Sequence, residues 1–543
     1  MKNKYINNKA MMLRTIKSFL LVFAVVLFAQ SCADRLDLQP EDNRLSADAA
    51  FEDPDAYKQF LAKIYAGISL SGQEGPAGFP DLAGLDEGFS NYLRLYWKMQ
   101  ELTTDEAIIA WNDGTIHDLH NQVWTSGNEF IRTMYSRLLY QVALCNEFLR
   151  QTTDGKLDGR GVSSDLRTEI QTFRAEARFM RALTYWHAMD LYANPPFITE
   201  NDPIGAFLPP QIQRADLFNY VESELLDIMD NMAAPRANEY GRADRAAAWM
   251  LLAKMYLNAE VYTGTPRYAD VITYTNNIIG AGYTIPSIPY FHSFLADNDS
   301  NGAEEEVIFT IPFDGLRTQA FGGMTFLTHA PVGGSMDPSE FGINGGWFGV
   351  RTTPTFVEKF PGEENSNDGR ELFYTDGQNK DILTVATFTD GFAIAKYRNV
   401  DVNGNPGSDT TGDHTDIDFP MFRLADAYLM YAEAVLRGGG GSMGTAVDYI
   451  NELRVRAYGD TSGNISQSDL DLDFILDERA RELYWEAHRR TDLIRFNQFS
   501  DNGVWQWKGG VQSGTTTDSF RDVMPLPATD LGINTNLEQN TGY

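Results

Sequence analysis

Apolar side chains recur every three to four residues along several stretches of this chain, which is the period of an α-helix. The longest such stretch runs from Thr168 to Pro196 and is apolar nearly all round in its second half. A helix of that kind is buried between other helices. It should stop at Asn194, Pro195 and Pro196, because proline cannot continue helical hydrogen bonding. We therefore expect the rest of the chain to pack around this helix.

The same period predicts further helices, so we expect a mainly α-helical protein. They should cover residues 53–68, 129–150, 217–232, 244–261, 268–279 and 477–496. The pattern Ala-x-x-Tyr-Leu begins at Ala253 and again at Ala425. Alternating small and large residues at helical spacing let neighbouring helices pack closely, as in tetratricopeptide repeats. The prediction is a scaffold of helical hairpins.

Residues 280–420 interrupt the helical pattern with a different composition. They are rich in Gly, Pro, Thr, Asn and aromatic residues, and they contain short β-like runs at Glu306–Pro312 and Phe392–Tyr397. Helices should resume at Phe419. Long irregular segments on a rigid scaffold usually carry function, so we expect a loop-rich ligand-binding side here.

The first 31 residues form a predicted targeting segment with five positive charges and no negative one. The apolar core Phe19–Ala29 is too short to span a bilayer but suits a signal peptide. Small Ser31 then precedes Cys32, which we predict to carry a lipid; ordinary secretory cleavage is the alternative. Residues 32–52 would be a polar tether, and residues 53–543 a single domain.

The chain is acidic, with a net charge of −31. Removing the first 31 residues takes away five of its 44 positive charges, which leaves 39 against 75 negative charges, or −36. This excess argues against binding to nucleic acid or to anionic lipid, both of which need Lys and Arg. Cys145 is the only cysteine besides Cys32, so there is no disulfide framework and we expect a buried, inert thiol.

Six stretches carry a family resemblance, and they occur in the same order along nearly the whole chain. They are GFSNYLRLYWKMQELTTDE, RAEARFMRALTYW, FGGMTFL, FPMFRLADAYLMYAEA, ERARELYWEAHRRTDLIRF and VWQWKGG. In these stretches the chain resembles the SusD/RagB family of outer-membrane glycan-binding lipoproteins. The resemblance implies an α-helical fold with about four tetratricopeptide-like helical pairs and an irregular, loop-rich binding side.

The resemblance also implies a location and a function. The protein would be lipid-anchored in the outer membrane of a Gram-negative bacterium and exposed at the cell surface. There it would capture starch or other α-glucan oligosaccharides, such as maltooligosaccharides, and deliver them to a TonB-dependent transporter. The family binds without catalysis, so we expect no enzyme activity and no required cofactor.

The family's starch site is an aromatic arc with a few hydrogen-bonding groups. Sugar rings have apolar faces and polar edges, which suit flat aromatic rings and nearby donors. By local matching, the resemblance places the arc on Trp111, Phe326 and Trp347, and the donor on Arg94.

This chain departs from the family pattern at three places. Ile109 stands where the family has a second tryptophan, so one stacking face is lost. Gly114 stands where an amide donor is expected, and Asn112 or Asp113 would replace it. Phe326 stands in place of a tyrosine and lacks its hydroxyl. An α-glucan nevertheless remains the expected ligand.

The run DNDSNG, which begins at Asp297 and contains Asp299, matches the first half of a calcium-binding loop. The closing glutamate would fall on Ile308, so a full EF-hand is excluded. Asp416 and Asp418 are candidates to complete a calcium site from elsewhere in the chain. The alternative is an Asx-rich turn without a metal ion.

Two other functions stay open from the sequence. A glycoside hydrolase needs two carboxylates at a set separation, and Asp86–Glu87 and Asp105–Glu106 are candidate pairs without a distinctive context. No H-E-x-x-H motif is present. A protein of the same transporter-partner type could instead bind another glycan or a peptide.

Overall fold

The computed structural model describes residues 47–83, 86–360 and 367–543. The predicted signal peptide, Cys32 and residues 32–46 of the predicted tether lie outside these ranges. Within them, no helix combines the length and the apolar character needed to cross a membrane.

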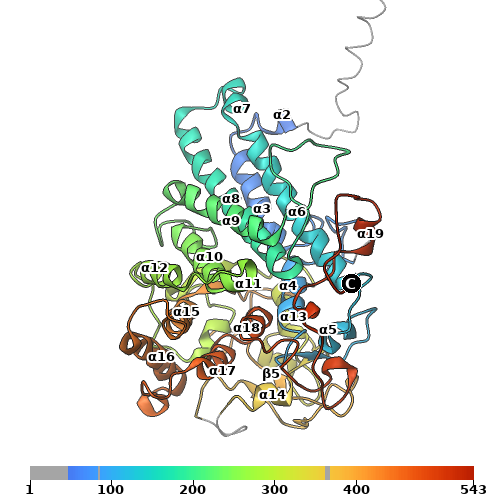
Figure 1. Ribbon diagram of the computed structural model, residues 1–543, viewed down its shortest axis with the longest axis vertical. Helices are drawn as coiled ribbons and strands as arrows, with labels where there is room; N and C mark the ends of the chain where they lie inside the picture. The colour runs from blue at the N-terminus through green and yellow to red at the C-terminus, as the bar shows by residue number, and fades with distance from the viewer. Residues whose placement is uncertain (1–46, 84–85, 361–366) are drawn as a thin grey trace, which may run out of the picture.

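The first half of the chain forms a bundle around the long helix α8 (Ser164–Tyr192). Helices α3 (Ala56–Ser69), α6 (Glu129–Gln151) and α9 (Arg214–Ile228) pack against it and appear beside it in blue to green (Figure 1). Its second half is buried on all sides, as the sequence predicts. The helix ends just before Ala193, whose φ of 56° leads into Asn194 and the two prolines.

A second set of helices continues the pairing. It comprises α10 (Arg245–Leu257), α11 (Ala259–Thr263), α12 (Tyr268–Ile279), α15 (Leu424–Leu436), α16 (Met443–Tyr458), α17 (Leu472–Leu483) and α18 (Arg489–Arg495). The α10–α12 pair and the α15–α16 pair carry the two Ala-x-x-Tyr-Leu patterns, and α12 packs on α15 (Figure 1). The helical-hairpin scaffold therefore continues across the intervening segment, and the predicted mainly α fold is confirmed.

Two local predictions are wrong. Residues 419–423 are not the start of a helix but strand β6 (Phe419–Arg423), which pairs antiparallel with β2 (Val307–Ile311) before α15 begins. The segment 477–496 is not one helix but α17 and α18, separated at residues 484–488. Trp485 and Ala487 there have φ of 63° and 65°, which no helix tolerates.

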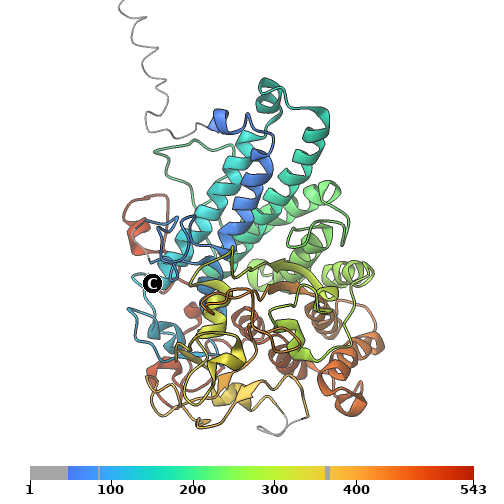
Figure 2. The same cartoon turned by 180° about the vertical axis from the view of Figure 1, so that it is seen from behind.

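The middle of the chain is loop-rich, as predicted, and appears in yellow at the lower end in both views (Figure 1, Figure 2). Its strands are short: β3 (Val350–Arg351) pairs with β1 (Ile108–Ile109) from the first part of the chain, and β4 (Phe373–Tyr374) pairs with β5 (Ala393–Ile394). The other described helices are α2 (Ala47–Ala50), α4 (Tyr92–Gln100), α5 (His117–Asn121), α7 (Asp154–Gly159), α13 (Gly323–His329), α14 (Pro354–Val357) and α19 (Ala528–Leu531). Short 3₁₀ turns cover Met229–Asn231, Tyr290–Phe294, Ala303–Glu305, Pro338–Phe341, Thr461–Gly463, Lys508–Gly510 and Ser519–Asp522.

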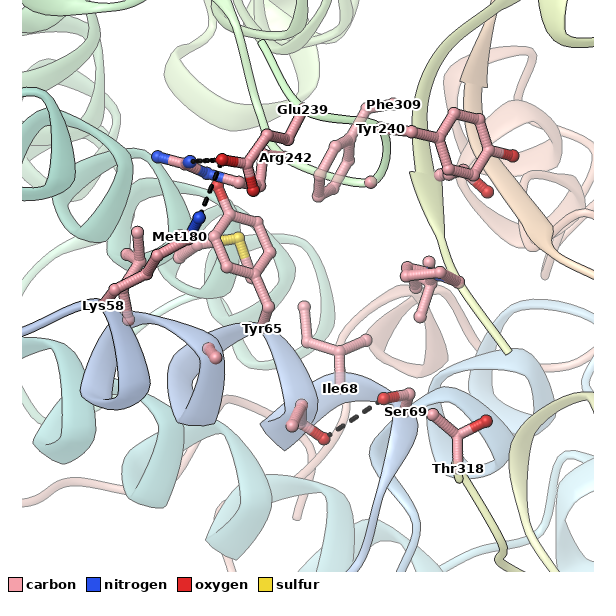
Figure 3. A pocket seen from close by; sticks show the side chains of 17 residues that line it. Lys58, Tyr65, Ile68, Ser69, Met180, Glu239, Tyr240, Arg242, Phe309 and Thr318 are labelled. Carbon is pink, nitrogen blue, oxygen red and sulfur yellow. Dashed lines mark hydrogen bonds and ion pairs between the residues drawn. The ribbon is translucent and has the colours of Figure 1, made fainter. Parts of the chain in front are cut away.

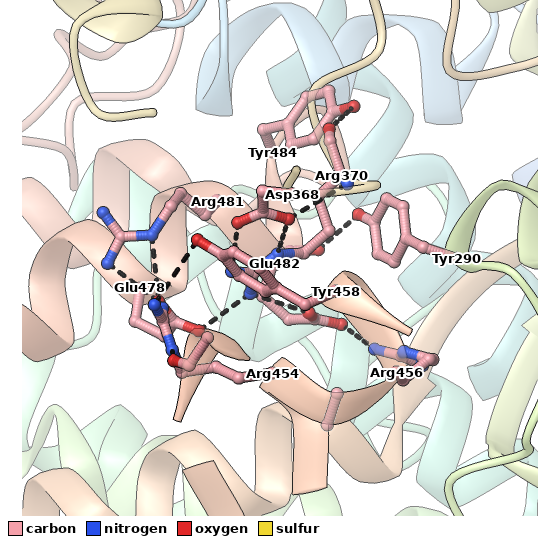
Figure 4. A network of polar contacts seen from close by, with 12 residues as sticks. Tyr290, Asp368, Arg370, Arg454, Arg456, Tyr458, Glu478, Arg481, Glu482 and Tyr484 are labelled. Atoms are coloured by element: carbon pink, nitrogen blue, oxygen red, sulfur yellow. Dashed lines mark hydrogen bonds and ion pairs between the residues drawn. The ribbon is translucent and has the colours of Figure 1, made fainter. Parts of the chain in front are cut away.

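A buried network of ion pairs fastens this middle region to the scaffold (Figure 4). Arg370 lies at its centre and donates to Asp368 at 2.7 Å and to Glu478 of α17 at 2.8 Å. Arg423 of β6 joins Glu306 at 2.9 Å and Glu482 of α17 at 2.7 Å. Every carboxylate is matched by a guanidinium, which a buried charge requires.

Candidate functional site

The structure brings Trp111 and Trp347 together, although they lie 236 residues apart in the chain. The β1–β3 pairing continues past the strands, where the amide of Ala110 donates to the carbonyl of Gly349 at 2.8 Å. The Trp111 indole Nε1 donates to the Trp347 carbonyl at 2.8 Å. The two ring centroids are 6.3 Å apart and the rings are inclined by 43°. Both indoles are half-buried, so each keeps part of its surface in solvent.

Arg94 of α4 lies next to these rings, as the resemblance implies. Its Cζ atom is 5.8 Å from the Trp111 ring centroid and 4.5 Å from that of Phe326. Burial lowers the pKa of Arg94 to about 10, against the opposing effect of nearby Asp86 and Asp113. The guanidinium therefore stays protonated at neutral pH and is half-buried beside the aromatic surface.

The stacking role predicted for Phe326 is corrected by its burial. Its side chain is 0% exposed. It packs edge-on against Trp97 with ring centroids 5.6 Å apart, and Trp111 lies above it at 6.1 Å. The ammonium group of Lys98 lies 5.5 Å from its centroid. A ring with no exposed face cannot stack on a sugar, so Phe326 supports Trp111 from below.

Phe321 is a half-buried aromatic side chain beside Trp347 that the sequence motifs did not single out. Its ring centroid is 6.5 Å from that of Trp347, and its carbonyl accepts a 3.0 Å hydrogen bond from Arg94. Both Phe321 and Phe326 belong to the FGGMTFL stretch, so this motif identified the right segment. The motif could not show that α13 begins at Gly323 and that Phe326, within this helix, faces the core.

Asn112 and Asp113, the predicted polar substitutes, are exposed in the turn that follows Trp111. Gly114 has a structural reason to lack a side chain. Its φ is 46°, and a Cβ atom there would lie 1.5 Å from a carboxylate oxygen of Glu129. That carboxylate accepts the backbone N–H of Thr115 at 3.2 Å, so a side chain at position 114 would displace the carboxylate from this bond.

The predicted calcium ligands hold loops together through hydrogen bonds. Asp297 accepts from the Asn301 amide at 3.0 Å. Asp416 accepts from the backbone of Gly315 at 2.6 Å, and Asp418 accepts from the backbone of Phe313 at 2.7 Å.

Burial, together with the negative charges of Asp299 and Asp416, raises the pKa of Asp418 to about 7. In the described part of the chain, no three His, Cys, Asp or Glu side chains are grouped to hold a metal ion. The calcium site stays a prediction.

The carboxylates considered for hydrolysis lie in unlike surroundings. Asp86 is exposed. Burial alone would raise the pKa of Asp105, but a bidentate ion pair with Arg489, in which each carboxylate oxygen accepts a 2.7 Å hydrogen bond, lowers it.

Burial raises the pKa of the Cys145 thiol to about 12, so this side chain is the inert core residue that the sequence predicts.

An apolar cavity of about 270 Å³ lies elsewhere, between α3, α8 and β2 (Figure 3). Leu61, Met180 and Phe309 are among the side chains that line it. Lys58 and Glu239, which form an exposed ion pair 2.8 Å long, also line it. None of the predicted site residues lines this cavity, so it is separate from the aromatic surface.

Comparison with known sequences places these features in a family. A sequence profile of the SusD family matches residues 362–543. The chain is 34% identical to the starch-binding protein SusD of Bacteroides thetaiotaomicron, over the full length of both proteins. It is 27% identical to the SusD-like protein P25 of Formosa agariphila, over 75% of this chain and 78% of that one.

Solved structures show the same fold. A SusD superfamily protein from Bacteroides vulgatus matches 90% of this chain and 99% of its own with a TM-score of 0.69 and 18% identity. The surface glycan-binding protein A of Bacteroides thetaiotaomicron, solved in complex with laminarihexaose, matches the same shares with a TM-score of 0.66 and 18% identity. Because it shares this fold and is 34% identical to SusD over the full length of both proteins, the chain belongs to the SusD family.

Proposed function

We propose that this protein binds glycans at the surface formed by Trp111, Trp347, Phe321 and Arg94, with α-glucan oligosaccharides from starch as the ligand class. The observation that supports this most directly is the pair of half-buried indoles, placed side by side by the bond from the Trp111 Nε1 to the Trp347 backbone carbonyl. Two inclined rings offer apolar faces to successive sugar units, and the guanidinium supplies donors for hydroxyl groups.

The choice of α-glucan rests on the 34% identity to a protein named for starch binding. A structural neighbour bound to laminarihexaose supports glycan binding in general and makes that glucan the main competitor. The protein binds without hydrolysis in this proposal, since Asp105 is held by Arg489 and no catalytic motif accompanies the paired carboxylates.

The test is isothermal titration of the purified protein with maltoheptaose, laminarihexaose and cellohexaose. We expect binding of maltoheptaose at least tenfold tighter than of the other two, about 1.4 kcal/mol. Preference for another glucan would assign that glucan as the ligand, and no binding of any glycan would overturn the proposed function.

A reducing-sugar assay on amylose checks catalysis, and release of reducing ends in proportion to the amount of protein would support the hydrolase alternative.

In the same proposal, Cys32 carries a lipid anchor and the protein delivers its glycan to a TonB-dependent transporter. Cys32→Ala should move the protein from the outer-membrane fraction to the soluble fraction, because acyl chains supply about 0.8 kcal/mol per buried methylene. Fractionation followed by immunoblotting measures this. A variant that stays in the membrane would show a different anchor, and crosslinking of the wild-type protein in cells tests for the transporter.

A further inference from the structure

His329, the last residue of α13, packs against the loop that carries Trp347. The imidazole stacks on the Trp347 indole, with ring centroids 4.8 Å apart and the planes inclined by 25°. Its Nδ1 atom is 2.7 Å from the carbonyl oxygen of Gly345. The backbone N–H of Trp347 donates to the His329 carbonyl at 2.9 Å. His329 therefore contacts this loop through its ring, its Nδ1 atom and its backbone.

A purely apolar packing role would not select histidine at this position. The side chain is 1% exposed, so its polar ring carries a desolvation cost that a phenylalanine in the same space would not have. The bond to Gly345 is what the imidazole adds. Burial lowers the pKa of His329, so the ring is neutral at pH 7 and its Nδ1 carries the proton that Gly345 accepts.

The rest of the loop has little freedom to set the indole by itself. A Cβ atom on Gly346 would lie 2.1 Å from the Val332 carbonyl, and one on Gly349 would lie 2.6 Å from the Trp111 ring. Phe348 between them is held at a φ of 54°, which is uncommon for a residue with a side chain. Close contacts therefore fix the backbone on both sides of Trp347. The freedom that remains is the orientation of the indole plane.

We propose that His329 is a positioning residue of the glycan site, which sets the plane of the Trp347 indole relative to Trp111. The proposal rests on the proposed function. His329 is too deeply buried to touch a glycan itself, so it acts only through Trp347. A wrongly inclined indole would offer the sugar an edge in place of a face, and affinity would fall without loss of the fold.

Three substitutions separate the two contacts that the imidazole makes. His329→Phe keeps a stacked ring and loses the bond to Gly345, His329→Gln keeps a donor and loses the ring, and His329→Leu loses both. We expect His329→Leu to weaken maltoheptaose binding about tenfold and the other two variants to fall between it and wild type. His292→Leu, a half-buried histidine in the 3₁₀ turn Tyr290–Phe294, is the matched control.

A double-mutant cycle with Trp347→Ala tests the route of the effect. If His329 acts through Trp347, adding His329→Leu to Trp347→Ala should change affinity by less than about twofold, because the coupled part is already lost. Equal losses in both backgrounds would overturn the proposal. Unchanged affinity in a folded His329→Leu protein would overturn it as well.

A ligand-free measurement keeps the test independent of the proposed function. With 5-fluorotryptophan incorporated, the ¹⁹F resonance of Trp347 is assigned by its loss in Trp347→Phe. We expect it to shift in His329→Leu, to shift less in His329→Phe, and to stay in place in His292→Leu. Failure of wild type to bind glucans would refute the proposed function, whereas an unmoved Trp347 resonance in a folded His329→Leu protein would refute the positioning role.

Discussion

At the scale of single residues, the aromatic surface contains side chains of two kinds. Trp111 and Trp347 are half-buried and keep part of their rings in solvent. Phe326, only 6.1 Å below Trp111, is fully enclosed. Substitutions among neighbours in this cluster should therefore separate binding from stability.

Trp111→Ala should weaken maltoheptaose binding about thirtyfold, or roughly 2 kcal/mol, because an anchoring aromatic face is removed. The melting temperature should fall only slightly, since the indole is half-buried. Trp111→Phe retains a ring face but cannot donate to the Trp347 carbonyl, and we expect an intermediate loss. Titration calorimetry and thermal melts measure both effects. Unchanged affinity in Trp111→Ala would place the site elsewhere.

Phe321→Ala and Phe326→Ala should have opposite profiles. Loss of the enclosed Phe326 ring should cost about 3–5 kcal/mol of unfolding free energy, because it leaves a cavity in the core. Loss of the half-buried Phe321 ring should cost about 1 kcal/mol or less of that free energy and weaken glycan binding about tenfold. Urea unfolding and calorimetry give the two quantities. A stable Phe326→Ala protein with lost binding would restore Phe326 as a direct contact.

At the scale of elements, the break between α17 and α18 depends on two buried carboxyl groups after α4. Glu101 accepts the backbone N–H of His488 at 3.0 Å, and Glu106 accepts that of Trp485 at 3.1 Å. These bonds satisfy donors that a continuous helix would have used internally. Burial raises the pKa of both carboxyl groups, to about 7 for Glu101, and proximity to Glu101 raises that of Glu106 further.

The pH dependence of stability should reveal this pair. A carboxyl group with a raised pKa in the folded protein stabilises it while protonated. That contribution is complete below about pH 4.5 and is lost as pH rises through about 7. Glu101→Gln still accepts from His488 and does not ionise. Its stability relative to wild type should therefore increase by on the order of 1 kcal/mol between pH 5 and 8.

Thermal melts at several pH values measure the difference. Glu169→Gln, on an exposed position of α8, is the control and should track wild type at every pH. A stability difference between Glu101→Gln and wild type that stays constant from pH 5 to 8 would contradict the raised pKa of Glu101.

At the scale of the whole molecule, the ion network of Figure 4 joins the loop-rich middle region to the helical scaffold. Arg370→Met should lower the unfolding free energy by about 3–5 kcal/mol, because it removes the guanidinium that Asp368, Glu478 and Glu482 share in the buried network. Arg317→Met removes an exposed ion pair with Asp314 and should cost less than about 1 kcal/mol. Urea unfolding at pH 7 compares them, and equal losses would show that the network does not fasten the two regions.

The helices of this protein follow from its sequence because their determinants are local. Apolar spacing predicts α8 and α12, and the Asn194–Pro196 stop lies two residues beyond the observed end of α8. The motifs also named the segments that meet at the candidate site. Local spacing decides which face of a helix is apolar, so the mainly α fold could be predicted without any knowledge of neighbours.

Only the tertiary structure decided which aromatic side chains reach solvent and where the last long helix breaks. Phe326 is enclosed because Trp97, Lys98 and Trp111 close around it from other segments. The α17–α18 break depends on a carboxyl group 379 residues away in the chain. Exposure and strained backbone are properties of contacts between distant segments, and no local pattern in a single sequence records those contacts.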